Sequence, residues 1–323
     1  MNRALLLSGL TLLVALLFAG SLMAGKIWVP FEAWFSSDPR WWIIAELRLP
    51  RAILGLAIGA GLGLTGAVLQ GYLRNPLADP AVVGVSASAA LGAVASIVLL
   101  AASAPLVIFA AAMAAAAGSM LLLVGLAWRA ESAVTFILAG TVLSSLAAAI
   151  TAFLISIAPN PFAVAEVIDW IMGALTDRSF AEAKLAVPFI ALGCAILFLT
   201  GRALDALTLG EDAARSLGLK LQRTQLLIVL GTGLTVGASV AVTGVVGFVG
   251  LIVPHLMRPL SDARPSALLL PSALGGAALV LAADSLVRLG PGATEIRLGV
   301  AMAMIGTPFF FFLLLRMRRS AWI

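Results

Sequence analysis

Long apolar runs separated by short polar breaks dominate this sequence. When Gly, Pro and charged residues are taken as breaks, ten apolar segments result. Several contain about 20 residues with almost no charge, the length that an α-helix needs to cross a hydrocarbon layer of roughly 30 Å. The predicted spans are 4–24, 52–72, 82–102, 105–127, 133–157, 184–201, 224–243, 244–260, 266–289 and 296–316.

This pattern predicts an all-α, polytopic membrane protein with ten transmembrane helices in a single domain of residues 1–323. A membrane β-barrel is excluded, because barrel strands alternate apolar and polar residues with a period of two. Bundled helices remain as the spanning structure. The segment 244–260 follows the preceding span without a polar break, so a re-entrant hairpin is the alternative to the full crossing that the charge pattern favours.

Composition and charge agree with this class, since 62% of the residues are hydrophobic and only 11% are charged. With the N-terminus inside, the inner side holds twelve basic and six acidic residues, and the outer side holds eight and nine. This distribution predicts that both termini are cytoplasmic. The excess of basic residues on the inner side also explains the sequence pI of about 10.3. The basic charge is therefore accounted for by membrane topology and contact with lipid, and it does not require a nucleic-acid partner.

The first apolar run has two interpretations. Met1-Asn2-Arg3 precedes it and Leu22-Met23-Ala24 ends it, which is also the layout of a cleaved signal peptide. An uncleaved first helix is the simpler interpretation, because the later spans require insertion in any case.

Residue types that carry chemistry are scarce. The single cysteine, Cys194, and the single histidine, His255, lie in apolar segments, and no cluster has metal-ligand spacing. Gly20 to Lys26 matches the start of a phosphate-binding loop, but it lacks the Ser or Thr that binds Mg²⁺ and it ends an apolar span. The sequence therefore predicts no metal, no cofactor and no enzymatic activity, and energy for transport must come from another chain.

The middles of the spans carry almost no ionisable residues, which argues against an ion-coupled secondary transporter. Asp284 is the main exception. Arg288 lies four residues later on the same helical face, so a local ion pair near the outer end is favoured over a proton relay. Gly55, Gly59 and Gly63 also share a face, which favours close helix packing over a glycine-lined conduit.

A charged segment at 202–223 interrupts the apolar pattern between the sixth and seventh predicted spans. Its middle, Leu209 to Leu221, must face water. Gly210 and Gly218 are expected to bracket a short helix within it, because glycine commonly ends helices. In so apolar a chain this segment predicts a docking surface for another protein.

Four patterns, in this order, resemble the FecCD family of permease subunits of bacterial ABC importers for iron chelates, haem and cobalamin. They are Arg48-Leu-Pro-Arg51, Asn75-Pro-Leu-Ala-Asp-Pro80, Leu209-Gly-Glu-Asp-Ala-Ala-Arg-Ser-Leu-Gly218 and Gly247-Phe-Val-Gly-Leu-Ile-Val-Pro-His-Leu-Met-Arg258. The resemblance runs from about residue 45 to the C-terminus. It implies a type II importer in the bacterial inner membrane, with two copies of this chain, two cytoplasmic ATPases and a periplasmic binding protein.

The resemblance also implies roles for single residues. Arg48, Arg51 and Arg288 resemble arginines that receive carboxylates of the binding protein, and anchoring to lipid phosphate is the alternative. The segment 202–223 resembles the cytoplasmic coupling segment that contacts the ATPase. Its contact residues are expected to be Leu209, Gly210, Glu211, Asp212, Arg215, Leu217 and Gly218.

Further residues are implied along the translocation path. Asn75 is similar to an asparagine of the family's cytoplasmic gate. The second gate element falls on Ala133 and Val134, where relatives carry a Ser-Thr-Ser run that this chain lacks. Trp170 and Met172 resemble residues of a short outer helix that lines the cavity mouth, and interfacial anchoring is again the alternative.

The function implied by the resemblance is import of an iron chelate, either a ferric siderophore or haem, by alternating access. Movement of the ATPases would pass through the coupling segment to the fifth and tenth spans. Cobalamin is the alternative substrate. An ion-coupled secondary transporter and a structural membrane protein are the more remote alternatives.

Overall fold

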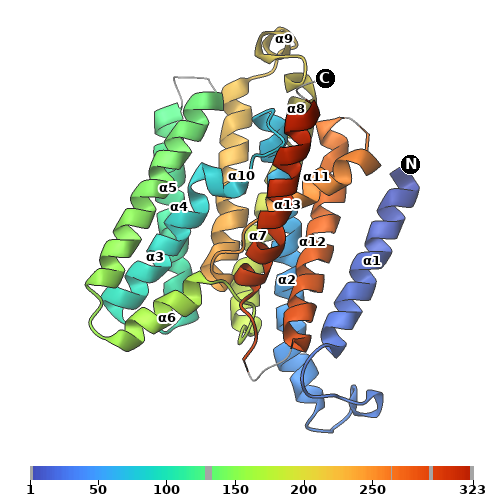
Figure 1. Cartoon of the computed structure of the whole chain (residues 1–323), viewed down its shortest axis with the longest axis vertical. Coiled ribbons are helices and arrows are strands. Elements are labelled where there is room, and N and C mark those ends of the chain that lie inside the picture. The colour runs from blue at the N-terminus through green and yellow to red at the C-terminus, as the bar shows by residue number, and fades with distance from the viewer. Residues whose placement is uncertain (1–2, 128–132, 263, 291–293, 321–323) are drawn as a thin grey trace.

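The computed structural model describes residues 3–127, 133–262, 264–290 and 294–320 of the 323-residue chain. These residues form a bundle of helices that run mostly along one long axis, and no strand occurs among them (Figure 1). The long helices are α1 (Arg3–Met23), α2 (Leu49–Tyr72), α3 (Val85–Leu100), α4 (Pro105–Ala127), α5 (Ala133–Ser156), α7 (Phe180–Phe198), α10 (Leu221–Thr243), α12 (Pro265–Leu289) and α13 (Leu298–Ser320).

Shorter helices occupy the ends and interior of the bundle. They are α6 (Pro161–Ile171), α8 (Gly201–Leu207), α9 (Glu211–Ser216) and α11 (Val249–Met257). Helix α6 lies at one end of the bundle and α9 at the opposite end (Figure 1). We name the two ends after these helices. The remaining turns are η1 (Phe31–Ala33), η2 (Ile43–Arg48, a π-turn continuous with α2), η3 (Pro80–Val83) and η4 (Arg258–Leu260).

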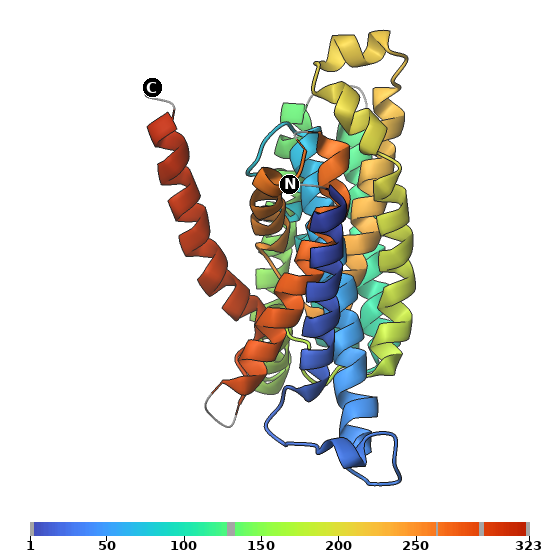
Figure 2. The same ribbon diagram turned by 90° about the vertical axis from the view of Figure 1, so that its right-hand side faces the viewer.

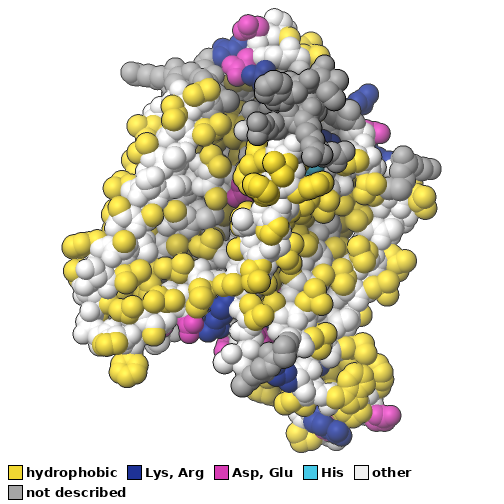
Figure 3. Space-filling view, in the orientation of Figure 1, with side chains coloured by type: hydrophobic (Ala, Val, Ile, Leu, Met, Phe, Trp, Pro, Cys, Tyr) yellow, Lys and Arg dark blue, Asp and Glu magenta, His cyan; other side chains and the backbone are white. Residues whose placement is uncertain are grey.

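Eight helices among the described residues are long and apolar enough to cross a membrane. The other two predicted spans contain shorter apolar helices, at Val85–Leu100 and Val249–Leu260. The all-α membrane fold is thus confirmed, whereas ten crossings remain a prediction. Hydrophobic side chains cover the sides of the bundle and charged ones gather toward its ends (Figure 3).

The segment 244–260 runs along the bundle from one end to the other. Residues 244–248 are not helical, and α11 begins only at Val249. Gly244 packs against the backbone of Trp170 and Gly173 at the α6 end. Past α11, Arg258 donates a hydrogen bond to Gln70 near the α9 end. A short non-helical stretch followed by a short helix therefore replaces both a regular span and a re-entrant hairpin.

Helices α2 and α12 pack closely at the centre because glycines remove the side chains between them. A Cβ atom at Gly59 would collide with the carbonyl group of Gly276, and one at Gly63 with that of Ser272. Gly55, on the same face, meets only side chains such as Leu281. The glycine spacing thus has the packing role that the sequence predicted.

The last long helix, α13, leans away from the bundle (Figure 2). Its apolar side chains are correspondingly exposed, among them Met304, Phe311 and Phe312. In one copy of the chain this surface has no protein cover.

Candidate functional site

At the α6 end, three predicted docking residues lie where helices begin or end. Arg48 ends the π-turn η2, Arg51 lies in the first turn of α2, and Arg288 lies in the last turn of α12. All three are buried, with exposed fractions of 6%, 8% and 3%. A buried guanidinium needs acceptors for its N–H groups, and their acceptors fall into two sets.

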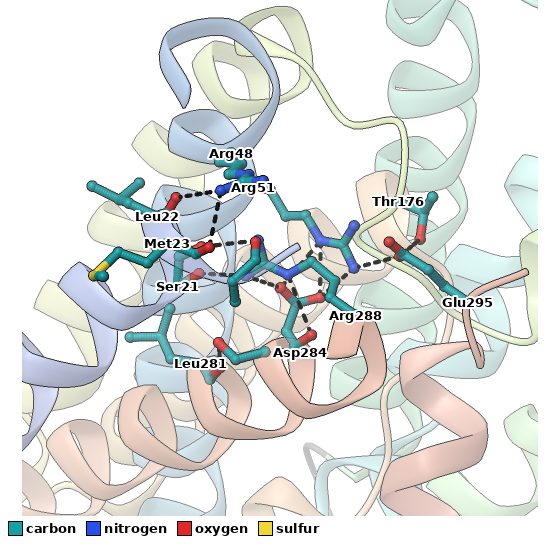
Figure 4. A network of polar contacts seen from close by, with 12 residues as sticks. Ser21, Leu22, Met23, Arg48, Arg51, Thr176, Leu281, Asp284, Arg288 and Glu295 are labelled. Atoms are coloured by element: carbon teal, nitrogen blue, oxygen red, sulfur yellow. Dashed lines mark hydrogen bonds and ion pairs between the residues drawn. The ribbon is translucent and has the colours of Figure 1, made fainter. Parts of the chain in front are cut away.

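The first set consists of carboxylates shared among α2, α12 and the segment before α13 (Figure 4). Arg51 donates to Asp284 through Nε at 3.0 Å and through Nη2 at 2.8 Å, and Nη2 also lies 2.9 Å from Oε2 of Glu295. Arg288 Nη2 lies 2.9 Å from Asp284 Oδ2. The predicted Asp284–Arg288 pair is therefore present, as part of a larger network.

Thr176 extends this network into the α6–α7 loop, where its hydroxyl donates to Glu295 at 3.0 Å. Burial raises the pKa of Glu295, but the hydrogen bond and charge of Arg51 outweigh burial and hold that pKa below its usual value. Glu295 is thus held as a carboxylate between Arg51 and Thr176.

The second set of acceptors is the C-terminal end of α1. Arg48 Nη1 donates to the carbonyl oxygens of Leu22 and Met23, each at 3.0 Å. Arg288 Nη1 donates to the carbonyl oxygen of Ser21 at 2.9 Å, and Nη2 donates to its hydroxyl. Helix C-terminal carbonyls lack intrahelical donors and carry partial negative charge, so cations stabilise them.

Gly25 explains part of the sequence that resembled a phosphate-binding loop. A Cβ atom there would lie 2.7 Å from Arg48 Nη2. The glycine therefore makes room for a guanidinium.

A cavity of about 260 Å³ opens beside these groups, and we call it the arginine cavity. Its charged lining residues are Lys26, Arg48, Arg51, Asp177, Arg178, Arg288 and Glu295. The three predicted arginines are thus buried at its wall and bonded to this chain, and do not project from the surface. Their contact with a binding protein remains a prediction that now requires access through the cavity.

Apart from Asp284 as the partner of Arg288, the partners of these arginines were not predicted from the sequence. Glu295 and Thr176 lie in loops with no motif, and Arg51 is 233 residues from Asp284. Arg297, also missed, pairs with Asp169 of α6 at 3.0 Å. Charge alone provided a weak signal, because isolated ionisable residues in an apolar chain tend to pair.

At the α9 end, the predicted short helix is present between the two expected glycines. Gly210 and Gly218 have φ angles of +99° and +83°, which favour glycine, and α9 lies between them. Leu209 and Leu217 flank the helix with exposed fractions of 67% and 68%. Exposed leucines on a polar segment are the kind of anchor that a protein interface buries.

The other predicted coupling residues lie on or beside α9. Glu211 pairs with Arg74, just past α2, at 3.6 Å. Asp212 and Arg215 are exposed. The pair at Glu211 connects α9 to the segment that contains Asn75.

Asn75 lies at the α9 end beside a cavity of about 360 Å³. Its Oδ1 accepts a hydrogen bond from the backbone N–H of Leu77 at 2.9 Å, which holds the turn after α2. Val134 lies exposed in the first turn of α5, whereas the side chain of Ala133 lies outside the described residues. The gate role of all three remains a prediction.

At the predicted cavity mouth, Trp170 lies on α6 but packs into the main apolar core and is 9% exposed. Most of its surface therefore contacts protein, and its role at the cavity mouth or as an interfacial anchor remains a prediction. Met172 follows as the C-cap of α6 and is partly buried, with its carbonyl close to Gly299. Among the described residues no group of three or more His, Cys, Asp or Glu side chains is arranged to hold a metal ion.

Comparison with known proteins identifies relatives over nearly the whole chain. The family model described as the FecCD transport family matches residues 12–316. The vitamin B12 import system permease of Vibrio cholerae is 38% identical, over 96% of this chain and 93% of its own length. The Fe(3+) dicitrate transport system permease protein FecD of Escherichia coli is 34% identical, over 96% and 99%.

A solved inward-facing structure of a metal-chelate type ABC transporter is also similar. It superposes with a TM-score of 0.87 at 31% sequence identity, and the match covers 97% of this chain and 99% of that one.

Proposed function

We propose, from the premise that this chain belongs to the FecCD transport family, that two copies of it form the membrane path of an ATP-driven importer for a metal chelate. As a member of that family it is a type II ABC importer permease, which moves a solute and carries out no bond chemistry. The finer parts of the proposal are the partners, the path and the solute.

The observation that carries the proposal is helix α9 with its two flanking leucines. It stands clear of the bundle at the end opposite α6 (Figure 1). Leu209 and Leu217 provide apolar contacts, and Asp212 and Arg215 provide exposed charge, as a cleft in a separate ATPase requires. Since Glu211 pairs with Arg74, motion of the ATPase would reach the turn that contains Asn75.

The path would run between two copies of the chain. Helices α5 and α13 both expose large apolar side chains, among them Phe153, Met304 and Phe311, which a second copy is suited to cover. Asn75, Ala133 and Val134 would close the path at the cytoplasmic end, where α9 meets the ATPase. Trp170 and Met172 would shape its outer end from within the protein wall.

The binding protein would dock at the opposite, periplasmic end. Arg48, Arg51 and Arg288 would contribute positive potential from the wall of the arginine cavity.

We propose an intact iron chelate, a ferric siderophore or haem, as the solute. The described residues offer no metal-ligand cluster, which suits a solute whose metal is already coordinated. Cobalamin is the second candidate, because the vitamin B12 permease of Vibrio cholerae is 38% identical to this chain, whereas the ferric dicitrate permease is 34% identical.

Reconstitution tests the proposal. The chain is placed in liposomes with the ATPase and binding protein encoded beside its gene, and uptake of ferric siderophores, haemin and cobalamin is measured. We expect uptake of one class that requires ATP and all three components. Uptake by this chain alone, driven by a proton or sodium gradient, would contradict the proposal.

Charge reversal on α9 tests the coupling surface in the same liposomes. We expect Asp212→Lys with Arg215→Glu to leave the permease folded while reducing ATP-driven uptake at least tenfold, because both charges are exposed on α9. Lys184→Glu, an exposed change at the other end of the bundle, is the control. Normal uptake by the double variant would remove α9 from the coupling interface.

A further inference from the structure

Two neighbouring cavities at the α9 end are lined by cations, and neither has a carboxylate among its described lining residues. One, of about 460 Å³, is lined by Arg202, Lys220 and Arg223. The other, of about 430 Å³, is lined by Arg215, Lys220 and Arg223. Among the residues that the structure describes, no ion pair involves Arg202, Lys220 or Arg223. These two basic cavities therefore hold positive charge that this chain does not balance locally.

An apolar groove between α4 and α10 begins where the basic cavities end. It has a volume of about 230 Å³, and its lining consists of apolar residues and one glycine. Leu226 lines both this groove and one of the basic cavities, so the two are continuous. Gly233 lines the groove farther along α10, where a Cβ atom would lie 3.0 Å from Cγ of Met120. The missing side chain leaves room between the two helices.

The groove follows one face of α10 away from its first turn. Leu226 and Leu230 come three and seven residues after Arg223, which places all three on the same helical face. Gly233 comes ten residues after Arg223, a distance of about 15 Å along the helix. This is half of a hydrocarbon layer of roughly 30 Å. The groove therefore extends from the headgroup level to about the middle of the bilayer, which is the length of one leaflet.

This groove lies on a side of the bundle that is open to lipid. Figure 2 shows α7 (yellow-green) and α10 (light orange) on the side opposite α13, which we have assigned to the contact with a second copy. Two leucines of the groove, Leu121 and Leu230, are 74% and 46% exposed. A second copy covering α13 would leave them facing the hydrocarbon.

We propose that the basic cavities and the groove form a site for one anionic phospholipid, with its phosphate at Lys220 and Arg223 and one acyl chain between α4 and α10. Basic pockets at the cytoplasmic ends of membrane helices bind such headgroups, and the guanidinium fork matches phosphate. A lipid is favoured over a carboxylate of the ATPase because the groove continues into the hydrocarbon layer, beyond the reach of a cytoplasmic protein. The inference goes beyond the proposed function and requires only that the chain spans a membrane.

Lipid counting tests the charged part of the site. Native mass spectrometry of the full-length permease in nonionic detergent measures binding of phosphatidylglycerol and phosphatidylcholine with identical acyl chains. We expect one phosphatidylglycerol per chain, bound at least tenfold more tightly than phosphatidylcholine. Lys220→Gln with Arg223→Gln should weaken phosphatidylglycerol at least tenfold and leave phosphatidylcholine nearly unchanged, because both cations at the phosphate are lost.

Arg3→Gln with Arg264→Gln is the matched control. It also removes two exposed cations near the same end, and neither residue lines the basic cavities or the groove. We expect it to change the affinity for either lipid by less than twofold. Thermal stability of each variant without added lipid shows whether the fold is intact.

The apolar part of the site is tested without a change of charge. Ala117 lines the groove on α4, so Ala117→Phe places a ring where the acyl chain would lie and should weaken both lipids about threefold or more. Ala117→Leu is the milder change if the ring prevents folding. Ala110→Phe, exposed on the same helix and outside the lining, is the control and should change binding by less than twofold.

Three outcomes would overturn the proposal. One is equal affinity for phosphatidylglycerol and phosphatidylcholine. Another is unchanged phosphatidylglycerol binding in the Lys220 and Arg223 double variant, and weaker association with the ATPase in that variant would then assign these cations to the ATPase. The third is binding of soluble glycerol 3-phosphate as tight as that of phosphatidylglycerol, which would show that the groove holds no acyl chain. None of these results bears on ATP-dependent uptake, which tests the proposed function separately.

Discussion

Asp284 holds together charges that the chain would otherwise bury unpaired. Its two oxygens accept from Arg51 and Arg288, and both guanidinium groups are almost fully enclosed. Neutralising one member of such a group leaves the charges of the others buried without a counter-charge. The stability lost in this way is greater than if the charged groups had never been buried. The packing of α2, α12 and α1 at the α6 end of the bundle therefore depends on the carboxylate of Asp284.

Replacing Asp284 with Asn should lower the free energy of unfolding by about 3–5 kcal/mol, because Arg51 and Arg288 lose their shared counter-charge. Thermal unfolding in detergent measures this loss. Glu295→Gln is the control and should cost less, since the Glu295 side chain is 23% exposed and water replaces part of its role. An equal loss in both variants would contradict the central position of Asp284.

Glu295 also predicts a pH dependence. Its folded-state pKa lies below the ordinary value of about 4.3, so its stabilising contribution is present above that value and is lost as the pH falls through the lowered pKa. We expect the melting temperature to fall more steeply below about pH 4 in the unmodified protein than in Glu295→Gln. Parallel acid profiles for the two proteins would exclude this contribution.

At the scale of elements, hydropathy located the helices well because a span must satisfy its backbone internally over a fixed thickness. It did not show where α11 starts, since residues 244–248 are as apolar as a helix yet are not helical. It also placed Arg48, Arg51 and Arg288 at helix ends without showing that they point inward. Only the Asp284–Arg288 pair could be predicted, from its spacing of four residues. The acceptors of Arg48 and Arg51, on α1, at Asp284 and at Glu295, are distant from them in sequence, so the sequence pattern does not indicate these pairings.

The packing of α2 against α12 can be tested with two alanine substitutions. Gly63→Ala forces a Cβ atom onto the carbonyl of Ser272, so it should destabilise the protein by about 1–3 kcal/mol or prevent folding. Gly118→Ala, in the middle of α4 with nothing within 4 Å, should be neutral or slightly stabilising. Thermal unfolding compares them, and a tolerated Gly63→Ala would mean that the two helices can move apart at little cost.

The whole molecule is asymmetric between its ends. Figure 1 shows α9 at one end and the loop between α1 and α2 at the other. The arginine cavity lies at this second end. The loop concentrates aromatic rings, with Trp34 in contact with Phe31, Phe35 and Trp41. Aromatic residues favour the interface between lipid and water.

The predicted orientation follows from this asymmetry and the distribution of charge. In a Cys194→Ser background, Ser216→Cys on α9 should react with a membrane-impermeant maleimide only in inside-out vesicles, and Ser37→Cys only in intact spheroplasts. Both serines are exposed, so access depends on the side of the membrane. The reverse labelling pattern would invert the proposed topology.

The distance in sequence between Arg51 and Asp284 has a consequence for biogenesis. Helix α12 can enter the membrane with its own neutral ion pair, whereas α2 is made first and its Arg51 lacks its two carboxylate partners, Asp284 and Glu295, at that stage. At roughly 5–20 residues per second, the ribosome needs on the order of tens of seconds to supply Asp284 after Arg51. During that interval the start of α2 must stay near the headgroups, so arrival of α12 completes the insertion of a helix made long before it.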